Sequence, residues 1–371
     1  MYNSYLTVIL KPTNACNMRC KHCYHSEKGY DNIVMDSSTY SHLLDITIPY
    51  IDNLKFIWHG GEPLLVGLPY LKKMIEVQKK YNHNECKLSN SIQTNASLLD
   101  QETIEYLIEN EFDIGISYDG PYNYVLRDKT EIVEKNIELL GENNASFGVL
   151  TVITSKSIEN IIDIYEYFKE KNIDFKFSYI FSSGEAKQNS ELFIDVDTYV
   201  EQVSRFFNYW LHDIKCNIHV DNFENILSLI HYHGKRECEY SSCLFHYLSI
   251  DSNGNIYPCG RSYGPEYCLG NVHDYENILD VFKSREYQNL LIGSINRRDK
   301  CMSSCEYYDY CQGGCNNNAI MENGLENHGG YSCQTFKKLF YSISKILKDS
   351  ENEEQDSLNP MYLSHIDFVR Q

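Results

Sequence analysis

The chain has 371 residues, enough for two domains with a sizeable core. Its formal net charge of -19 argues against nucleic acid or an anionic membrane as the main partner, because phosphates would be repelled. The acidity would favour a basic or neutral peptide, or it reflects a solvated surface. No apolar run reaches the roughly 18 residues of a membrane span, and residues 1–12 do not resemble a signal peptide, so we expect a cytoplasmic protein.

From residue 5 to about residue 215, short apolar strands alternate with amphipathic helices. We predict strands at Tyr5–Leu10, Leu54–Trp58, Leu88–Gln93, Asp113–Ser117, Phe147–Ile153 and Phe175–Phe181. We predict helices near residues 37–48, 69–81, 100–110, 130–141, 158–171 and 195–214. Six βα units in a row indicate an α/β fold with a parallel sheet, either open or closed into a partial barrel. In such sheets the chemistry lies at the carboxyl ends of the strands.

After about residue 217 the pattern changes. We predict one helix at 219–233, then short hairpins and loops rich in Cys, Gly, Tyr and Asn, with a strong turn signal at residues 251–255. A helix near 335–348 and a polar tail follow, and we interpret the acidic stretch 350–356 as a solvated linker. A loop-rich region of this size has little apolar core, so metal clusters would supply the missing folding energy.

The chain contains fourteen cysteines, and they are clustered. Three lie between Cys16 and Cys23, and nine lie between Cys238 and Cys333. Because no export signal precedes them, we expect a reducing compartment, where clustered thiols hold metal rather than form disulfides. Only two stand alone, and we predict that these are packing residues, namely Cys86 and Cys216.

The first cluster of cysteines follows the first predicted strand. Cys16, Cys20 and Cys23 have the spacing C-x3-C-x2-C. Three thiolates can hold three corners of a 4Fe-4S cube and leave the fourth iron open, as catalysis requires. The alternative is a zinc site with a fourth ligand from His22 or His25.

With this spacing at this strand end, the chain resembles the radical SAM (S-adenosylmethionine) superfamily over about residues 5–215. The resemblance extends to Gly60, Gly61, Glu62 and Pro63, which follow the second strand. In the family this motif lines the amino group of SAM, since glycine permits close backbone approach and a glutamate suits a cation.

Other strand ends also resemble this family, in its peptide-maturing and sulfatase-maturing branch. The resemblance implies that Asn95 and Ser117 donate to the ribose or carboxylate of SAM, and that Arg127 clamps the carboxylate. It also suggests Tyr24 beside the adenine. Ordinary strand-end hydrogen bonding, surface charge and packing are the alternatives for these four residues.

The second cluster of cysteines closely resembles the SPASM domain, a two-cluster extension of radical SAM enzymes, over about residues 238–335. Where the family has C-x2-C, this chain has three residues between Cys301 and Cys305. The resemblance assigns one auxiliary 4Fe-4S cluster to Cys238, Cys243, Cys259 and Cys315. It assigns the other to Cys301, Cys305, Cys311 and Cys333. Two zinc-ribbon-like sites would need the same eight thiols.

These resemblances imply a domain organisation. We expect a partial (β/α)6 TIM-like barrel at 1–217, a bridging helix and linker at 218–237, a small Cys-rich SPASM domain at 238–335, and a C-terminal helix with a polar tail at 336–371. Cys268 fits neither auxiliary cluster. It is either a buried free thiol or a proton donor near the substrate, and it is the one catalytic candidate.

The resemblance implies three 4Fe-4S clusters, SAM as cofactor and a 5′-deoxyadenosyl radical that abstracts hydrogen from a substrate. We expect a peptide maturase that crosslinks side chains of a ribosomally made precursor peptide, through a carbon–carbon (cyclophane-type) bond or a thioether, with a flavodoxin or ferredoxin as electron donor. The alternatives are a formylglycine-generating sulfatase maturase, a small-molecule dehydrogenase, and a non-catalytic cluster or zinc scaffold.

One observation weighs against formylglycine formation and so favours the crosslinking reaction. Sulfatase maturases usually carry an Asp directly after the cysteine of the G-x4-C stretch, whereas this chain has Gly260 and Arg261 after Cys259. Fully ligated auxiliary clusters would accept an electron from a substrate radical. Because the chain starts almost at its first strand, we expect no leader-binding domain, so that the barrel mouth, the SPASM face, the tail or a separate partner recognises the peptide.

Overall fold

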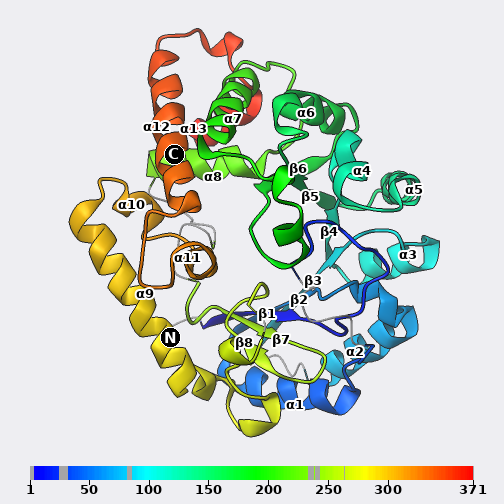
Figure 1. Ribbon diagram of the computed structural model, residues 1–371. Helices are drawn as coiled ribbons and strands as arrows, with labels where there is room; N and C mark the ends of the chain where they lie inside the picture. The colour runs from blue at the N-terminus through cyan, green and yellow to red at the C-terminus, as the bar shows by residue number, and fades with distance from the viewer. Residues whose placement is uncertain are drawn as a thin grey trace. The chain divides into compact units, whose positions relative to one another are not determined.

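The computed structural model describes residues 4–24, 32–81, 86–232, 238, 243–262 and 264–370. In this part of the chain the backbone forms two compact units, and each unit is assembled from segments that are far apart in the sequence (Figure 1). The first unit comprises residues 1–117, 127–147 and 243–293, and the second comprises residues 118–126, 148–242 and 294–371.

A parallel sheet forms the core of the first unit. Its strands are β1 (Tyr5–Leu10), β2 (Asn53–Trp58), β3 (Lys87–Thr94), β4 (Asp113–Ser117), β7 (Tyr247–Ile250) and β8 (Ile256–Tyr257). Their order within the unit is β4-β3-β2-β1-β7-β8, and all neighbours are parallel except β7 and β8, which form an antiparallel hairpin. Val8 of β1 lies opposite Phe56 on one side and Leu248 on the other.

Helices flank this sheet, and α1 and α2 lie along the outside of β1 and β2 (Figure 1). The helices of the first unit are α1 (Ser37–Thr47), α2 (Leu68–Tyr81), α3 (Gln101–Glu109) and α5 (Thr130–Glu142), with 3-10 helices at Ile48–Tyr50, Pro63–Val66, Pro265–Tyr267, Val272–Asp274 and Ile278–Lys283. The carboxylates of Asp36 and Asp100 cap α1 and α3, because each accepts a backbone hydrogen bond from the first turn.

The second unit contains two parallel strands and most of the remaining helices. Its strands are β5 (Phe147–Ile153) and β6 (Asp174–Tyr179). Its helices are α4 (Asn123–Leu126), α6 (Ile161–Glu170), α7 (Val196–Leu211), α8 (Asp221–Tyr232), α10 (Tyr308–Cys311), α11 (Asn316–Glu322), α12 (Tyr331–Asp349) and α13 (Pro360–Arg370), with 3-10 helices at Gly120–Tyr122, Ile158–Asn160, Gly184–Gln188, Ser190–Leu192 and Gln355–Ser357. A further helix, α9 (Arg285–Ser304), begins in the first unit and ends in the second.

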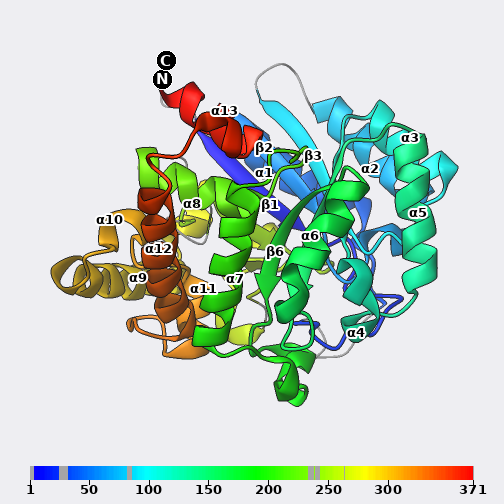
Figure 2. The ribbon, with the colours of Figure 1, turned by 90° about the horizontal axis from the view of Figure 1, so that it is seen from above.

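Aromatic side chains fill the core of the second unit. Helix α7 runs beside α12 (Figure 2) and presents Phe206 to Phe223 of α8 with ring centroids 4.7 Å apart. Phe223 also meets Phe177 of β6, and Trp210 is completely buried next to them. These contacts fix α7 and α8 against β6 through a large apolar area.

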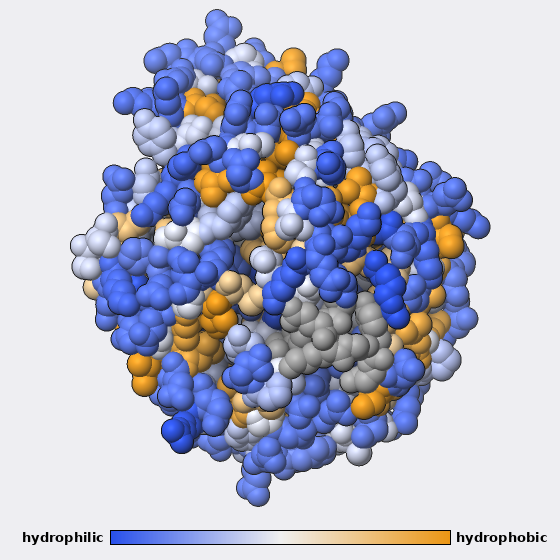
Figure 3. Space-filling model, in the orientation of Figure 1, coloured by the Kyte–Doolittle hydropathy of each residue, from blue (hydrophilic) through white to orange (hydrophobic). Residues whose placement is uncertain are grey.

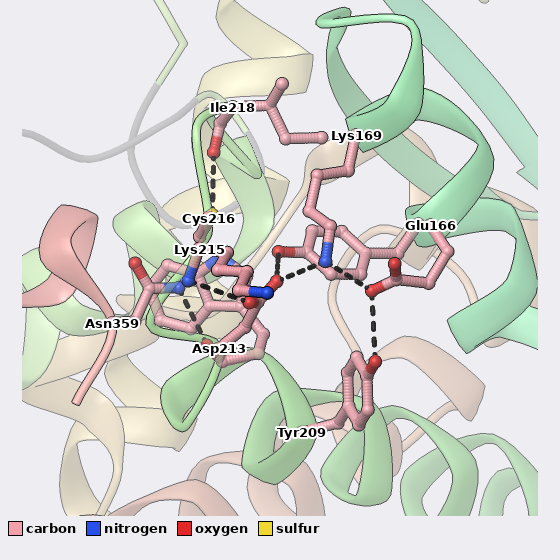
Figure 4. Close-up of polar contacts among 10 residues, drawn as sticks. Glu166, Lys169, Tyr209, Asp213, Lys215, Cys216, Ile218 and Asn359 are labelled. Carbon is pink, nitrogen blue, oxygen red and sulfur yellow. Dashed lines mark hydrogen bonds and ion pairs between the residues drawn. The ribbon is translucent and has the colours of Figure 1, made fainter. Parts of the chain in front are cut away.

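A polar network joins α6 to α7 and to the chain that follows it (Figure 4). Lys169 donates to both Glu166 and Asp213 at 2.7 Å, and the Tyr165 hydroxyl donates to Asp213 at 2.6 Å. Burial would raise the pKa of Asp213, but the bonds from Lys169 and Tyr165 outweigh it and lower the pKa below its ordinary value. This ion pair therefore stabilises the fold at neutral pH, and its contribution is lost as pH falls through the lowered pKa of Asp213.

The alternation of strands and helices predicted for residues 5–215 is confirmed, with all six strands in place. The loops and hairpins predicted after residue 238 are only partly correct. The turn at 251–255 does join β7 to β8, but the 20-residue helix α9 occupies a region for which we predicted hairpins and loops. The tail after the helix near 335–348 contains a further helix, α13, at residues 360–370, which we did not predict.

Hydrophilic residues cover most of one face of the molecule, and apolar residues form small separate groups there (Figure 3). Among the described residues, no helix is long and apolar enough to cross a membrane.

Candidate active site

The loop that carries Cys16, Cys20 and Cys23 follows β1 directly and is held by hydrogen bonds of its own chain. Met18, which belongs to this loop, is buried. The backbone N–H of Cys23 donates to the carbonyl of Cys20 at 3.1 Å, and the backbone N–H of Met18 lies 3.5 Å from the Cys16 sulfur. All three cysteines are partly exposed. Three thiols from one loop match a cluster that keeps one iron open.

Two glycines after β2 let the chain pack against this loop. A Cβ at Gly60 would lie 2.3 Å from the carbonyl oxygen of Thr13, and one at Gly61 would lie 2.2 Å from that of Ala15. The backbone N–H groups of Gly61 and Glu62 donate to these same two carbonyls, at 3.2 and 2.9 Å. The Gly-Gly pair is therefore required by the close approach of two backbones, and its predicted approach to SAM stays a prediction.

The carboxylate of Glu62 joins the ends of β2 and β3. It is 1% exposed and accepts hydrogen bonds from the Thr94 hydroxyl at 2.7 Å, the Asn95 N–H at 2.8 Å and the Leu64 N–H at 3.0 Å. Burial raises the pKa of Glu62, although these three donors act in the opposite direction. That this carboxylate also meets the amino group of SAM stays a prediction, and in the structure it accepts hydrogen bonds from neutral donors of its own chain.

Asn95 connects the end of β3 to the cysteine loop. Its amide nitrogen donates to the Asn17 side chain at 2.9 Å and lies 3.9 Å from the sulfur of Cys16. Hydrogen bonds to ligand sulfurs tune iron–sulfur clusters, so this amide fits the surroundings of one. The structure thus brings together Cys16, the Gly60–Pro63 motif and Asn95.

The other predicted SAM contacts have different surroundings. The Ser117 hydroxyl accepts from the Gln93 amide at 2.9 Å. Arg127 lies near His22, the residue considered above as an alternative zinc ligand. Burial lowers the pKa of His22, and the nearby charge of Arg127 lowers it further. His22 is thus kept neutral, and His25 lies outside the described residues. Tyr24 lies below the ammonium group of Lys11, which is 6.0 Å from the ring centroid.

Lys11 is a residue that our sequence analysis did not single out. It follows β1, is 1% exposed, and donates to the carbonyl of Gly260 at 2.7 Å. Burial lowers the pKa of Lys11 to about 8, although Cys259 and Asp251 act in the opposite direction. The available signal was a lysine directly after an otherwise apolar strand, at the sheet edge where chemistry is expected.

A side chain at position 260 would press on the side chain of Ile9. A Cβ there would lie 2.9 Å from Cδ1 and 3.2 Å from Cγ2 of Ile9, while the carbonyl of Gly260 holds Lys11. The absence of an Asp at this position therefore has a local packing reason.

In the second unit, four cysteines surround one cavity. Cys301 lies near the end of α9, Cys305 follows that helix, Cys311 ends α10 and Cys333 lies in the first turn of α12. They line a cavity of about 110 Å³, and Cys315 also contributes to its wall. Burial is the main cause that raises the pKa of Cys301 and of Cys311. The charges of Cys305 and Cys333, which lie nearby, raise both pKa values further.

Within the described part of the chain, no three His, Cys, Asp or Glu side chains gather closely enough to hold a single metal ion. The thiols of a 4Fe-4S cube lie farther apart than the ligands of one zinc ion, because the cube separates them. The four cysteines around the cavity supply the number of thiolates that one 4Fe-4S cluster needs.

Two cations border this cavity. Arg297, 1% exposed, donates to the carbonyls of Gly313, Gly314 and Leu325 and to the side chain of Asn316, which fixes the loop between Cys311 and Cys315. The second cation is Lys337 of α12. Burial acts to lower the pKa of Lys337, but the Cys333 and Cys305 thiols outweigh it and raise the pKa.

The cysteines assigned to the other auxiliary cluster are divided between the two units. Cys243 and Cys259 belong to the first unit, and Cys238 and Cys315 belong to the second. Their common ligation of one cluster stays a prediction.

The three remaining cysteines lie apart from these sets. Cys268 is half-buried, and its thiol is 3.5 Å from the carbonyl oxygen of Gly270. Cys86 and Cys216 are buried, which confirms their prediction as packing residues.

Comparison with known proteins decides the family. Residues 10–195 match the radical SAM superfamily, which is half of the chain. The chain belongs to the radical SAM superfamily. Residues 238–316 match the SPASM iron–sulfur cluster-binding domain, so this is a radical SAM enzyme with auxiliary clusters, and its cofactors are 4Fe-4S clusters and SAM.

Several relatives of this radical SAM chain match almost its whole length. A cysteine-type anaerobic sulfatase-maturating enzyme of Clostridium perfringens (strain 13 / Type A) is 27% identical over 94% of this chain and 99% of its own length. A serine-type anaerobic sulfatase-maturating enzyme of Bacteroides thetaiotaomicron is 25% identical over 96% and 93%. The structure of native anSMEcpe with bound AdoMet and the Kp18Cys peptide is 26% identical, covers 93% of this chain and 99% of its own, and has a TM-score of 0.81.

These relatives overturn the expectation that the chain crosslinks a precursor peptide. The likeness to sulfatase-maturating enzymes extends over the whole chain, whereas the argument against formylglycine formation rested on one position. That position, Gly260, reflects packing against Ile9. A cyclophane or thioether product is therefore not supported. The alternative, a sulfatase maturase, is the better supported.

Proposed function

We propose that this radical SAM enzyme is an anaerobic sulfatase-maturating enzyme, which oxidises one cysteine of a sulfatase polypeptide to formylglycine. The observation that carries the proposal is the match to the Clostridium perfringens cysteine-type enzyme, which includes both the cysteine loop after β1 and the region of the auxiliary cysteines. A full-length match is informative because peptide oxidation needs both regions.

The residues that would hold the cofactors follow from the motifs. Cys16, Cys20 and Cys23 would hold the SAM cluster, and the two auxiliary sets would hold the others. The chemistry supplied by these clusters when bound is one-electron transfer, which splits SAM to a hydrogen-abstracting 5′-deoxyadenosyl radical and takes up the electron that the substrate loses. A flavodoxin or ferredoxin would exchange electrons with the enzyme.

The protein residues hold SAM and exclude water from the radical. We assign the amino end of SAM to the Gly60–Pro63 motif, whose backbone lies directly against the cysteine loop. Asn95, Ser117, Arg127 and Tyr24 complete the proposed contacts. Within this motif, Glu62 also keeps the ends of β2 and β3 together through its hydrogen bonds to Thr94 and Asn95.

The reaction balances as a two-electron oxidation. The cysteine loses one hydrogen atom from Cβ, then an electron and the thiol proton, which leaves a thioaldehyde. Water replaces the sulfur, so that the products are the aldehyde and hydrogen sulfide. The base that takes the proton is not residue 260, because glycine has no side chain.

Anaerobic turnover of synthetic sulfatase peptides tests the proposal. The reconstituted enzyme, SAM and a reductant should convert a cysteine peptide to a product that has lost sulfur, reacts with a hydrazine reagent and fragments along its whole length. A serine peptide run in parallel tells which residue is preferred. The proposal is wrong if neither peptide forms an aldehyde while SAM is cleaved.

A further inference from the structure

A pocket of about 170 Å³ lies at the carboxyl end of β6, within the second unit. Its walls come from the end of β6 and the residues after it, from the chain before α7, and from α11 and the start of α12. The side chains that shape it are those of Tyr179, Phe181, Phe193, Ile194, Met321 and Tyr331. Met321 is 37% exposed, so the pocket is open to solvent rather than an internal void.

Contacts between aromatic rings fix the walls of this pocket. The Tyr179 ring lies 4.8 Å from that of Phe181 and 4.9 Å from that of Tyr331, measured between centroids. A pocket with fixed aromatic walls is preorganised, so little ordering of the protein opposes binding. An apolar cavity of about 150 Å³ in another protein holds benzene, so this volume suits a branched aliphatic or aromatic side chain.

The charge of the lining excludes an ionic ligand. Among the described residues that line the pocket, Glu322 alone carries a charge. Its carboxylate accepts the backbone N–H of Ser332 at 3.1 Å and also the Ser332 hydroxyl, and it thereby caps the start of α12. A carboxylate engaged in this way leaves the pocket with an apolar preference.

The location of the pocket indicates the kind of molecule that enters it. In parallel α/β sheets, ligands bind at the carboxyl ends of the strands, and the pocket begins at the last residue of β6. Tyr179 and Glu322 also line the cavity of Cys301, Cys305, Cys311 and Cys333, so that the two cavities share a wall. The related anSMEcpe has been solved with peptides bound.

We propose that this pocket binds one apolar side chain of the peptide substrate, at a position flanking the residue that is oxidised. The proposal rests on the proposed function and names a determinant of its specificity. The occupant is a neutral leucine-sized or aromatic side chain, because the walls are apolar, the volume fits, and the only lining carboxylate already has partners.

Binding of a fluorescent sulfatase peptide to the reconstituted holoenzyme with SAM, without reductant, measures this interaction apart from turnover. In the peptide, each apolar and each polar flanking residue is replaced by Ala in turn. We expect one apolar position at which Ala weakens Kd roughly ten- to hundredfold, the value for burying a leucine-sized side chain. Replacing that same residue by Asn should be at least as damaging, since an amide would lose its water on entering walls that are mainly aromatic and aliphatic.

Two exposed serines on the chain between β6 and α7 give a matched pair of variants. Ser182→Trp places a large ring at the pocket, whereas Ser190→Trp places it outside. Ser182→Trp should weaken peptide binding about tenfold or more and Ser190→Trp should leave it unchanged, with equal iron content and melting temperature in both. If Ser182→Trp is misfolded, Met321→Ala replaces it: this variant should weaken the apolar peptide several-fold but not the peptide that already carries Ala.

The outcomes separate this inference from the proposed function. If the peptide binds and is oxidised, but no apolar position matters and Ser182→Trp binds normally, the pocket proposal is wrong and the function stands. If the wild-type enzyme neither binds nor oxidises any sulfatase peptide, the proposed function is wrong. The assignment of a peptide side chain to the pocket is then wrong as well. A pocket that selects a charged side chain would also overturn the proposal.

Discussion

The cysteine loop after β1 and the cysteines around the cavity of the second unit are positioned by different means. The ends of two strands fix the first. The backbone N–H groups of Gly61 and Glu62, after β2, donate to the loop, and the carboxylate of Glu62 accepts hydrogen bonds from the end of β3. The second is spread over α9, α10 and α12, and a buried arginine fixes the loop after Cys311. A site on strand ends stays in place without its metal, whereas a site spread over separate helices and the loops between them depends on ligation.

Removal of the cysteines gives the largest expected effect. Replacing Cys16, Cys20 and Cys23 by Ala should abolish formation of 5′-deoxyadenosine and leave about two thirds of the iron. Because strand ends hold this loop, the melting temperature should change little. Replacing Cys301, Cys305, Cys311 and Cys333 by Ala should instead lower it clearly, by differential scanning calorimetry. Equal losses of stability in the two variants would contradict the comparison.

Close backbone packing in the first region is tested at Gly61. Ala at this position would place Cβ 2.2 Å from the backbone oxygen of Ala15, so Gly61→Ala should cost about 3 kcal/mol of unfolding free energy and weaken SAM binding. The control is Gly141→Ala in α5, where nothing lies within 4 Å and helix propensity predicts a gain of up to about 1 kcal/mol. A normal SAM affinity in Gly61→Ala would argue that the loop tolerates displacement.

The buried arginine of the second region is tested by Arg297→Met. The loss of its bonds to Gly313, Gly314, Leu325 and Asn316 should destabilise the protein by about 2–3 kcal/mol. The variant should also lose about four irons per chain, one cluster, as measured by iron analysis. Arg205→Met, on an exposed part of α7, is the control and should keep its iron.

Two adjacent lysines of α12 provide the smallest and most specific test. Lys337 lines the cysteine cavity, whereas Lys338 points to Asp197 and pairs with it. A cation near a cluster favours its reduced form, so Lys337→Met should lower the reduction potential of one auxiliary cluster by an amount on the order of tens of millivolts. Redox titration followed by electron paramagnetic resonance measures this, and Lys338→Met should leave all potentials unchanged.

The sequence predicted the strands and the cysteine sets better than the scaffold around them. The strands of the first 215 residues have clear apolar runs, and the C-x3-C-x2-C and SPASM spacings are specific. Helix α9 was missed because Arg285–Ser304 is largely polar and contains Cys301, which we had placed in a loop. Arg297 lies in this helix, so its buried role was hidden as well.

The roles of single residues depend on contacts that spacing does not encode. The motif predicts Glu62 beside the amino group of SAM, but it does not reveal that Thr94 and Asn95, about thirty residues away at the end of another strand, hold this carboxylate. Likewise, Gly260 stands where related enzymes usually carry an Asp. The close contact of this position with Ile9 is seen only in three dimensions. Such facts require three-dimensional neighbours rather than motif recognition.

The pairing of β7 with β1 has a consequence for how the protein is made. β1 ends at residue 10, but the strand that covers its second edge begins at Tyr247. At about 5–20 residues per second of synthesis, the edge of β1 waits on the order of ten to fifty seconds for its partner. During that interval an apolar strand edge is open to other chains, so a nascent or truncated protein that ends before β7 should be prone to aggregate and should depend on chaperones.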